Sequence, residues 1–307
     1  MKKTILSILF IIAALFAIDR IGSQLMWWVN QHSHDVTAPK IKYLTDGVHE
    51  NIILMGTSRC QGHYVPSIIR DTVGMSVYNG GIDASENIFS HYIVLSHILG
   101  KHTPKVICLD VRRNDLFKEI NPFRATSFFA PYYGRNSGAD SVYKLTGTAW
   151  EYEVSHLYRF NSKAPSNILG LFHNKQDRKG ADNGYLPLQQ PKTPLQIGDE
   201  IKQPQVKEID ENKYEYLLRF INACKSRGVK LVFVVSPTPS RVDEDYYAAL
   251  KKVSNEHGVP FLDYHTPGLF LDHPEYFRDR QHLCDKGAKE FTPIFASDLK
   301  RVINKFK

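Results

Sequence analysis

Short apolar runs alternate with segments of helical spacing along most of this chain, and this alternation constrains the fold more than any other feature. The runs are typical of strands buried on both faces, and they occupy residues 51–55, 75–78, 105–111, 229–236 and 260–264. Helical segments separate or follow them, at residues 64–73, 85–99, 213–227, 243–257 and 286–306. The sequence therefore predicts a three-layer α/β/α fold around a parallel sheet of about five strands.

Residues 118–212 interrupt this alternation with a segment rich in Tyr, Phe, Asn, Gly and Pro. Long irregular segments inside compact domains are often lids or binding loops. We therefore expect a large irregular insertion that packs over one end of the sheet. Its aromatic run at residues 128–133 either lines a sugar site or packs the lid itself.

The N-terminus has the form of an export signal. Two lysines precede an apolar stretch at residues 4–18, which Asp19 and Arg20 end. This stretch is shorter than the roughly 20 residues that cross a bilayer, but apolar character resumes at residues 21–28, where two Trp residues suit a membrane interface. An A-x-A cleavage pattern is not evident. The segment is therefore either a cleaved signal peptide or an uncleaved anchor.

These patterns divide the chain into three parts. Residues 1–22 form the signal peptide or anchor, residues 23–48 a polar stalk or linker, and residues 49–307 one domain that includes the insertion. We expect this domain to lie outside the cytoplasm, in the periplasm or at the cell surface, attached to the membrane through the N-terminal segment. A buried helix in a cytoplasmic domain is the alternative interpretation of the N-terminus.

Composition argues against several classes of function. Hydrophobic residues make up 42% of the 307 residues and charged residues 23%, as in ordinary folded proteins. The net charge of +7 is spread along the chain without a long basic run, which argues against a nucleic-acid groove. The four cysteines form no CxxC pair, and the histidine spacings imply no metal site. We therefore expect no nucleic-acid partner, metal or organic cofactor.

A serine directly follows the first predicted strand, in the segment Gly56-Thr57-Ser58-Arg59. A serine on a tight turn between a strand and a helix is exposed at the sheet edge, where the helix N-terminus helps to hold an oxyanion. The alternative role for Ser58 is a helix N-cap, which serine also favours. Arg59 either meets an anionic group of a substrate or forms a structural salt bridge.

A second polar pair precedes the last predicted helix. Asp279 and His282 have the spacing D-x-x-H, which allows a carboxylate to orient an imidazole from the same turn. Ligand sites in parallel sheets lie beyond the carboxyl ends of the strands, and these residues fall there together with Ser58. The order predicts a triad of Ser58, His282 and Asp279. Cys60 and Cys284 lie two residues after Ser58 and His282, so they either pair or share that neighbourhood as buried thiols.

Four short blocks of the sequence resemble those of the SGNH, or GDSL-like, hydrolase superfamily. Gly56-Thr57-Ser58 resembles the Gly-Asp-Ser of the first block, with Thr57 in place of Asp. Residues 77–85 resemble the second block, V-x-N-x-G-x-x-G-x-S, with Ala84 at its second glycine.

The other two blocks follow in the expected order. Residues 110–115 resemble the third block, G-x-N-D, with Arg112 at the position of its glycine, so the local turn must differ. We expect Asp110, at the end of its strand, to be structural. The segment from Asp279 to His282 matches the D-x-x-H of the last block.

The resemblance covers residues 49–117 and 213–300 and implies a flavodoxin-like sheet with a serine hydrolase site. It assigns the backbone N–H of Gly81 and the side-chain amide of Asn114 to an oxyanion hole, beside the N–H of Ser58. It also implies attack of the serine on an ester carbonyl without a cofactor.

The anchor-like N-terminus and the Tyr-rich insertion make the chain similar to membrane-attached cell-envelope members of this superfamily, such as the DltD-like and polysaccharide-acetylation proteins. The resemblance implies an esterase or acyltransferase that acts on acyl groups, chiefly acetyl, of an acylated cell-surface glycan. The altered residues at positions 57 and 112 also leave open a catalytically inactive envelope protein that binds glycan or a membrane partner. A glycosidase or nuclease would need converging acids or metal ligands, which the sequence does not clearly offer.

Overall fold

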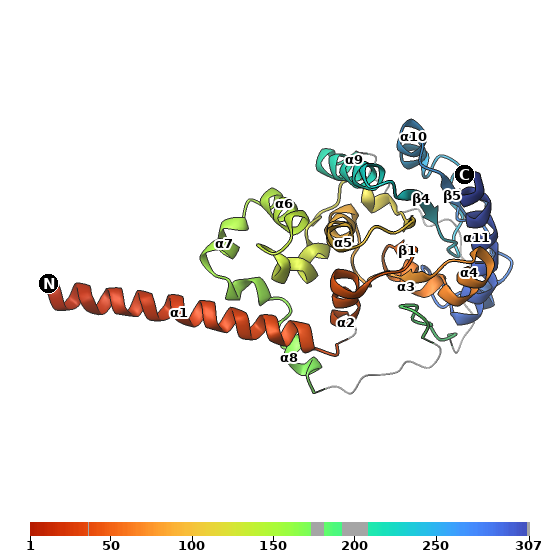
Figure 1. Cartoon of the computed structure of the whole chain (residues 1–307). Helices are drawn as coiled ribbons and strands as arrows, with labels where there is room; N and C mark the ends of the chain where they lie inside the picture. The colour runs from red at the N-terminus through yellow and green to blue at the C-terminus, as the bar shows by residue number, and fades with distance from the viewer. Residues whose placement is uncertain (36, 173–180, 192–207, 306–307) are drawn as a thin grey trace. The chain divides into compact units, whose positions relative to one another are not determined.

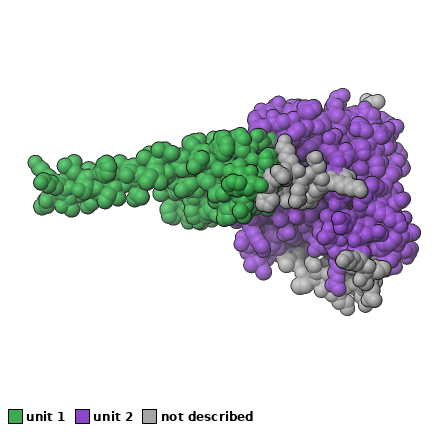
Figure 2. Space-filling model, turned by 90° about the horizontal axis from the view of Figure 1, so that it is seen from below, with its two compact units in different colours: residues 1–42, 126–176 green, residues 43–125, 177–307 purple. Residues whose placement is uncertain are grey.

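The computed structural model describes residues 1–35, 37–172, 181–191 and 208–305. The chain forms two compact units, which Figure 2 colours separately. Unit 1 comprises residues 1–42 and 126–176, and unit 2 comprises residues 43–125 and 177–307.

Unit 2 is built around a sheet of five parallel strands, as the alternation of apolar runs predicts. The strands are β1 (Ile52–Met55), β2 (Val77–Asn79), β3 (Val106–Asp110), β4 (Lys230–Val235) and β5 (Phe261–Asp263). Their order across the sheet is β2-β1-β3-β4-β5, and every neighbouring pair is parallel. The predicted α/β fold class is confirmed.

Helices cover both faces of this sheet. Figure 1 shows α4 (Pro66–Val73) and α11 (Asp285–Lys305) on one side, and α5 (Ile88–Lys101) and α9 (Glu211–Ser226) on the other. Alternate strand residues point to opposite faces. The face under α11 forms a core of strand residues and helix residues that include Ile52, Leu54, Val106, Cys108, Val232, Val234, Phe291, Phe295 and Leu299.

The connections bring the loops of interest to the carboxyl edge of the sheet. A short helix, α3 (Ser58–His63), follows β1, and the single turn η2 (Arg113–Asp115) follows β3. Helix α10 (Ala248–Glu256) precedes β5, and the turn η5 (Pro274–Tyr276) lies between β5 and α11. The helical spacing predicts the long helices to within a few residues, but it does not predict α3, because six residues are too few to show a period.

Unit 1 consists of helices. They are α1 (Lys2–His32), α2 (Ala38–Lys42), most of η3 (Arg124–Tyr132), α6 (Ser137–Leu145), α7 (Ala149–Val154), η4 (Leu157–Phe160) and α8 (Ala164–Gly170). The segment expected to be an irregular insertion is therefore partly helical, and its residues 126–176 group with the N-terminal helix. The helices are short, and several are 3-10 turns, so they leave little helical period in the sequence.

The residues expected to form a polar stalk are also largely helical. Helix α1 continues to His32, α2 follows it, and residues 43–47 form a π-helical turn that belongs to unit 2. Side-chain contacts extend α1 into unit 1: Asp19 Oδ1 accepts a hydrogen bond from Ser155 Oγ at 2.5 Å, and Asn30 Oδ1 accepts one from Asn167 Nδ2 at 2.8 Å. Contacts between residues more than 130 positions apart are not visible in a local sequence pattern.

Helix α1 is long and apolar enough to cross a membrane by length and composition. Its first part exposes large apolar side chains, among them Ile5, Leu6, Leu9, Phe10, Ile12, Leu15 and Phe16. This agrees with a signal anchor or a membrane span.

Candidate active site

The loop before α11 brings His282 to the serine that follows β1. Ser58 Oγ lies 2.8 Å from His282 Nε2, and His282 Nδ1 lies 2.8 Å from Asp279 Oδ1 and 3.0 Å from Asp279 Oδ2. Each pair is within hydrogen-bond reach. The three residues therefore form a continuous serine–imidazole–carboxylate chain, in the geometry that activates a serine hydroxyl.

Asp279 holds its own loop as well as the imidazole. Its Oδ1 accepts hydrogen bonds from the backbone N–H groups of Gln281 at 2.9 Å and His282 at 3.0 Å. This side-chain-to-backbone turn is a common use of aspartate, and here it fixes the spacing that the D-x-x-H pattern predicts. The Asp279 side chain is 47% exposed and that of His282 20% exposed, so the triad lies at the protein surface.

The backbone around Ser58 explains the Gly-x-Ser sequence. Gly56 has a φ of 152°, and a Cβ there would lie 2.8 Å from Cys60 Cβ, so only glycine fits. Thr57 is the N-cap of α3 but makes no side-chain capping bond. Ser58 is the first helical residue, and its hydroxyl turns to the histidine. The N-cap interpretation of Ser58 is therefore excluded.

A second histidine, His63, holds the loop that carries His282. Leu283 N donates a hydrogen bond to His63 Nε2 at 2.9 Å, which leaves the ring proton on Nδ1, 3.0 Å from Ser236 Oγ. His63 is fully buried, and burial, followed by the charge of His282, lowers its pKa well below the ordinary value. A neutral His63 thus ties α3 to the residue that follows His282. The sequence leaves His63 as either a surface or a satisfied core histidine; the structure places it in the core and adds this positioning role.

Gly81 lies against α3, but its N–H is already bonded. It donates to Asn79 Oδ1 at 3.0 Å, while Asn79 Nδ2 donates to the carbonyl oxygens of Cys60 at 2.7 Å and Tyr64 at 2.9 Å. Ala84, at the second glycine position of the resembled block, has the left-handed φ of 61° that glycine favours. The Gly81 N–H expected in the oxyanion hole therefore has a partner within the protein.

Asn114 is held in the same way. Its Nδ2 donates to Glu119 Oε2 at 3.2 Å. The buried ammonium of Lys213 donates to Asn114 O and Phe117 O, each at 2.9 Å, and to Glu119 Oε1 at 2.8 Å. The amide has two N–H donors, so Asn114 keeps one N–H that could hold an oxyanion while the other bonds to Glu119. Neither Glu119 nor Lys213 shows a signal in the sequence, because neither belongs to a motif.

Arg59 takes the structural role that was one of its two predicted roles. Its Nη2 lies 2.8 Å from Asp110 Oδ1, and Asp110 Oδ2 accepts a hydrogen bond from Tyr64 Oη at 2.6 Å. The side chains of Arg59 and Asp110 are 6% and 2% exposed. Asp110 is therefore structural, as expected. Arg59 also lines a cavity, in which its Nε is buried without a hydrogen-bond partner.

All four cysteines are buried free thiols, Cys60 and Cys284 among them. Of the two alternatives for Cys60 and Cys284, pairing is therefore not formed, and the interpretation as buried thiols holds. Among the residues that the structure describes, no group of three or more His, Cys, Asp or Glu side chains could hold a metal ion.

No family model and no curated protein matches the chain. Among solved structures, it is similar to a candidate acylhydrolase from Bacteroides fragilis, at 12% identity and a TM-score of 0.40 over 83% of this chain and 86% of that one. It is also similar to a gut microbial diltiazem-metabolizing enzyme, at 16% identity and a TM-score of 0.31 over 81% of this chain and 47% of that one. Likeness at this level says nothing about activity, which must be argued from the site itself.

Proposed function

We propose that the protein is a serine esterase or acyltransferase of the SGNH type. The observation that carries this proposal is the triad: Ser58 Oγ, His282 and Asp279 follow one another at 2.8 Å spacings from two loops at one edge of the sheet. More than 220 residues separate the serine from the histidine, and each side chain is turned toward its partner. This chain of hydrogen bonds matches the requirement of acyl transfer through a covalent serine ester.

The reaction follows from the two ends of the imidazole. Asp279 accepts a hydrogen bond from Nδ1–H of His282, which keeps the proton on Nδ1 and leaves Nε2 free to take the proton of Ser58 as its Oγ attacks the ester carbonyl. His282 then returns that proton to the departing alcohol. Water, or a sugar hydroxyl in the case of transfer, releases the acyl group by the same steps in reverse order.

The developing oxyanion has two sources of stabilisation near Ser58. The first N–H groups of a helix have no partner within it, and Ser58 is the first residue of α3. The second source is the N–H of the Asn114 amide that is not used in the 3.2 Å bond to Glu119. One such donor contributes roughly 3 kcal/mol to the transition state in enzymes of this kind.

The substrate class follows from the N-terminal helix and from the resemblance to envelope proteins. A chain that exposes an apolar helix of this length would hold its site close to a membrane. We therefore propose acyl esters of a cell-surface glycan as substrate, with acetyl as the acyl group, and an extracytoplasmic location.

A fluorophosphonate probe tests the proposal directly, because it reacts with activated serines. We expect the full chain to be labelled, and Ser58→Ala to abolish the labelling. His282→Ala should lower the labelling rate by at least about 10³-fold, since the serine loses its base. Ser67→Ala is a matched control on α4 and should leave labelling unchanged.

One observation favours a second candidate, a non-catalytic glycan-binding protein. Of the three expected oxyanion donors, the Gly81 N–H is bonded to Asn79 Oδ1, and the Asn114 amide uses one of its two N–H groups on Glu119. If the folded chain resists labelling and does not hydrolyse 4-nitrophenyl acetate, this second function replaces the first.

A further inference from the structure

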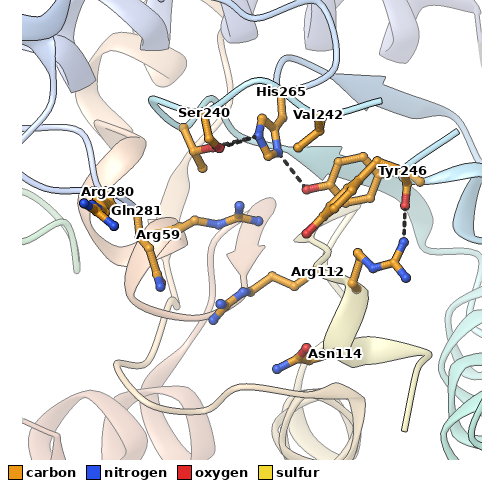
Figure 3. Close-up of a pocket in the computed structure, with 12 residues that line it drawn as sticks. Arg59, Arg112, Asn114, Ser240, Val242, Tyr246, His265, Arg280 and Gln281 are labelled. Carbon is orange, nitrogen blue, oxygen red and sulfur yellow. Dashed lines mark hydrogen bonds between the residues drawn. The ribbon is translucent and has the colours of Figure 1, made fainter. Parts of the chain in front are cut away.

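A cavity of about 150 Å³ lies among the loops that also carry the triad. Its lining includes Arg59, the neighbour of Ser58, and Arg280 and Gln281, which lie between Asp279 and His282. Arg112 and Asn114 from the loop after β3 complete this side. These residues come from the segments after β1 and β3 and from the loop before α11, which all lie at the carboxyl edge of the sheet. Several of them are sequence neighbours of Ser58, Asp279 and His282. In the view of Figure 3, Arg59 and Arg112 lie between Arg280 and Tyr246.

The charge of this cavity is one-sided. Four arginines line it, namely Arg59, Arg112, Arg113 and Arg280, and no acidic side chain appears among its described lining residues. Two of the four are engaged: Arg59 pairs with Asp110, and Arg113 donates to Tyr246 O at 2.7 Å while lying over the rings of Phe117 and Tyr246.

The other two arginines, Arg112 and Arg280, form no close ion pair among the described residues. Burial, and next the charge of Arg59, lowers the pKa of Arg112, although the charges of Glu86, Asp115 and Asp110 act in the opposite direction. Arg59 Nε is also buried and has no hydrogen-bond partner, although Arg59 itself is only 5% exposed.

The remaining polar groups suit an anion as well. His265 is buried and neutral, because burial and the charge of Arg59 lower its pKa to about 4. Its Nε2 lies 2.8 Å from Thr238 Oγ1 and 3.1 Å from Ser240 Oγ, and its Nδ1 lies 2.9 Å from Tyr247 Oη. This wall therefore presents hydroxyl groups and no negative charge, so the arginine donors dominate the cavity.

We propose that this cavity binds an anionic substituent of the ester substrate, a carboxylate, sulfate or phosphate, through Arg112, Arg59 and Arg280. A guanidinium donates two parallel hydrogen bonds to such groups. The inference rests on the proposed function, since it assigns the cavity to the substrate of the same triad. It narrows the substrate class from acyl glycans in general to esters of an acidic glycan or of an acidic acyl group.

Three chromogenic esters test the inference with the full chain. They are 4-nitrophenyl acetate, which is neutral, mono-4-nitrophenyl succinate, with a carboxylate on the acyl side, and 2-acetoxy-5-nitrobenzoate, with a carboxylate on the alcohol side. We expect at least one acidic ester to exceed the neutral one about tenfold in kcat/KM, a typical effect of one charge-assisted hydrogen bond. Arg112→Gln should remove this preference and Arg112→Lys should restore part of it.

Arg70→Gln is the matched control, since Arg70 is exposed on α4 and pairs with Asp71. It should retain the wild-type preference. Equal kcat/KM for the three esters in the wild-type chain would overturn the inference, and so would a preference that survives Arg112→Gln.

A binding measurement separates this inference from the proposed function. Sodium sulfate, compared with sodium chloride at equal ionic strength, should raise the Tm of the wild-type chain, of Ser58→Ala and of Arg70→Gln, but not of Arg112→Gln. If fluorophosphonate labelling and ester turnover are absent while this sulfate effect is present, the esterase function fails and the anion site stands. If sulfate has no effect that depends on Arg112, the anion site fails whatever the turnover shows.

Discussion

Gly81 shows how a single residue connects two sequence blocks. A Cβ at this position would lie 2.3 Å from Gln61 N and 2.8 Å from Cys60 Cβ. The loop after β2 therefore approaches the backbone of α3 so closely that only glycine fits. Asn79 then bonds to both partners, since it accepts from Gly81 N and donates to Cys60 O. In this structure the glycine fixes the helix that carries the serine.

Gly81→Ala is expected to move α3 away and to disturb Ser58. We expect a loss of about 2 kcal/mol in the free energy of unfolding, since the added methyl overpacks a closed contact. Esterase activity should fall at least about tenfold, because a shift of one ångström in a catalytic group is costly. Urea unfolding and 4-nitrophenyl acetate hydrolysis measure the two effects.

Gly100→Ala is the control, because a Cβ there would meet nothing within 4 Å at the end of α5. It should leave activity unchanged and alter stability by no more than about 1 kcal/mol. Equal effects of the two substitutions would contradict the packing argument.

A contact between residues on one turn can be predicted from their spacing in the sequence. A contact between residues far apart in the chain cannot be predicted in this way. Asp279 and His282 lie on one turn, so their pattern alone predicts their contact. The contact of Ser58 with His282 requires the fold, but the alternation of strands and helices supplies that fold. His63 escapes this reasoning, because its partner Leu283 lies 220 positions away and a backbone N–H has no sequence signature.

At the scale of elements, α9 and the loop after β3 form one polar unit. The Asp210 side chain caps α9 by accepting from Asn212 N at 3.0 Å and Lys213 N at 3.1 Å, which sets Lys213 in the first turn. From there the lysine enters the core and bonds to Asn114 O and Glu119 Oε1. The helix period around Lys213 predicts α9, but a lysine in that period is ordinarily read as solvent-exposed.

Lys213→Met tests this unit. The substitution keeps much of the side-chain length but removes the ammonium donor from the carbonyl groups of Asn114 and Phe117 and the counter-ion from the Glu119 carboxylate. We expect a loss of about 3 kcal/mol in the free energy of unfolding, typical of breaking a buried ion pair. Lys225→Met, on an exposed position of the same helix, should change stability by less than about 0.5 kcal/mol. A loss of similar size in both variants would contradict the role of Lys213.

For the whole molecule, the sequence predicts the sheet correctly but not the division into two units. A parallel sheet follows from local periodicity, which is why all five strands are found near their predicted positions. The grouping of residues 126–176 with the N-terminus depends on contacts such as those of Asp19 and Asn30, which no local pattern reveals. Residues 173–180 and 192–207 of the expected insertion lie outside the described residues.

Stability of the whole molecule should depend on pH through His265. Its pKa is about 4 in the folded chain, lowered first by burial, against about 6.5 when unfolded. The folded state therefore binds fewer protons between these values, so this contribution is complete above about pH 6.5 and is lost as pH falls toward 4. Burial raises the pKa of Asp115 to about 7, which has the opposite effect, so a variant must isolate the histidine.

His265→Gln provides that comparison, because glutamine keeps polar atoms but does not titrate. Between pH 7 and pH 4 the wild-type chain should lose about 3 kcal/mol more of its unfolding free energy than this variant loses. Urea unfolding at several pH values measures it. A difference that is constant with pH would show that His265 has an ordinary pKa.

The contacts of Asp19 in the N-terminal helix bear on whether this segment can be cleaved from the chain. Its carboxylate accepts hydrogen bonds from Ser155 Oγ, His156 N and Leu157 N, in the segment where α7 ends and η4 begins. A peptidase that cut the chain near residue 22 would remove this acceptor from unit 1. Removal of the leader would therefore leave the hydroxyl of Ser155 and the N–H groups of His156 and Leu157 without this acceptor. A chain that starts at residue 23 should keep serine labelling, while limited proteolysis should cut its residues 137–172 faster than those of the intact chain.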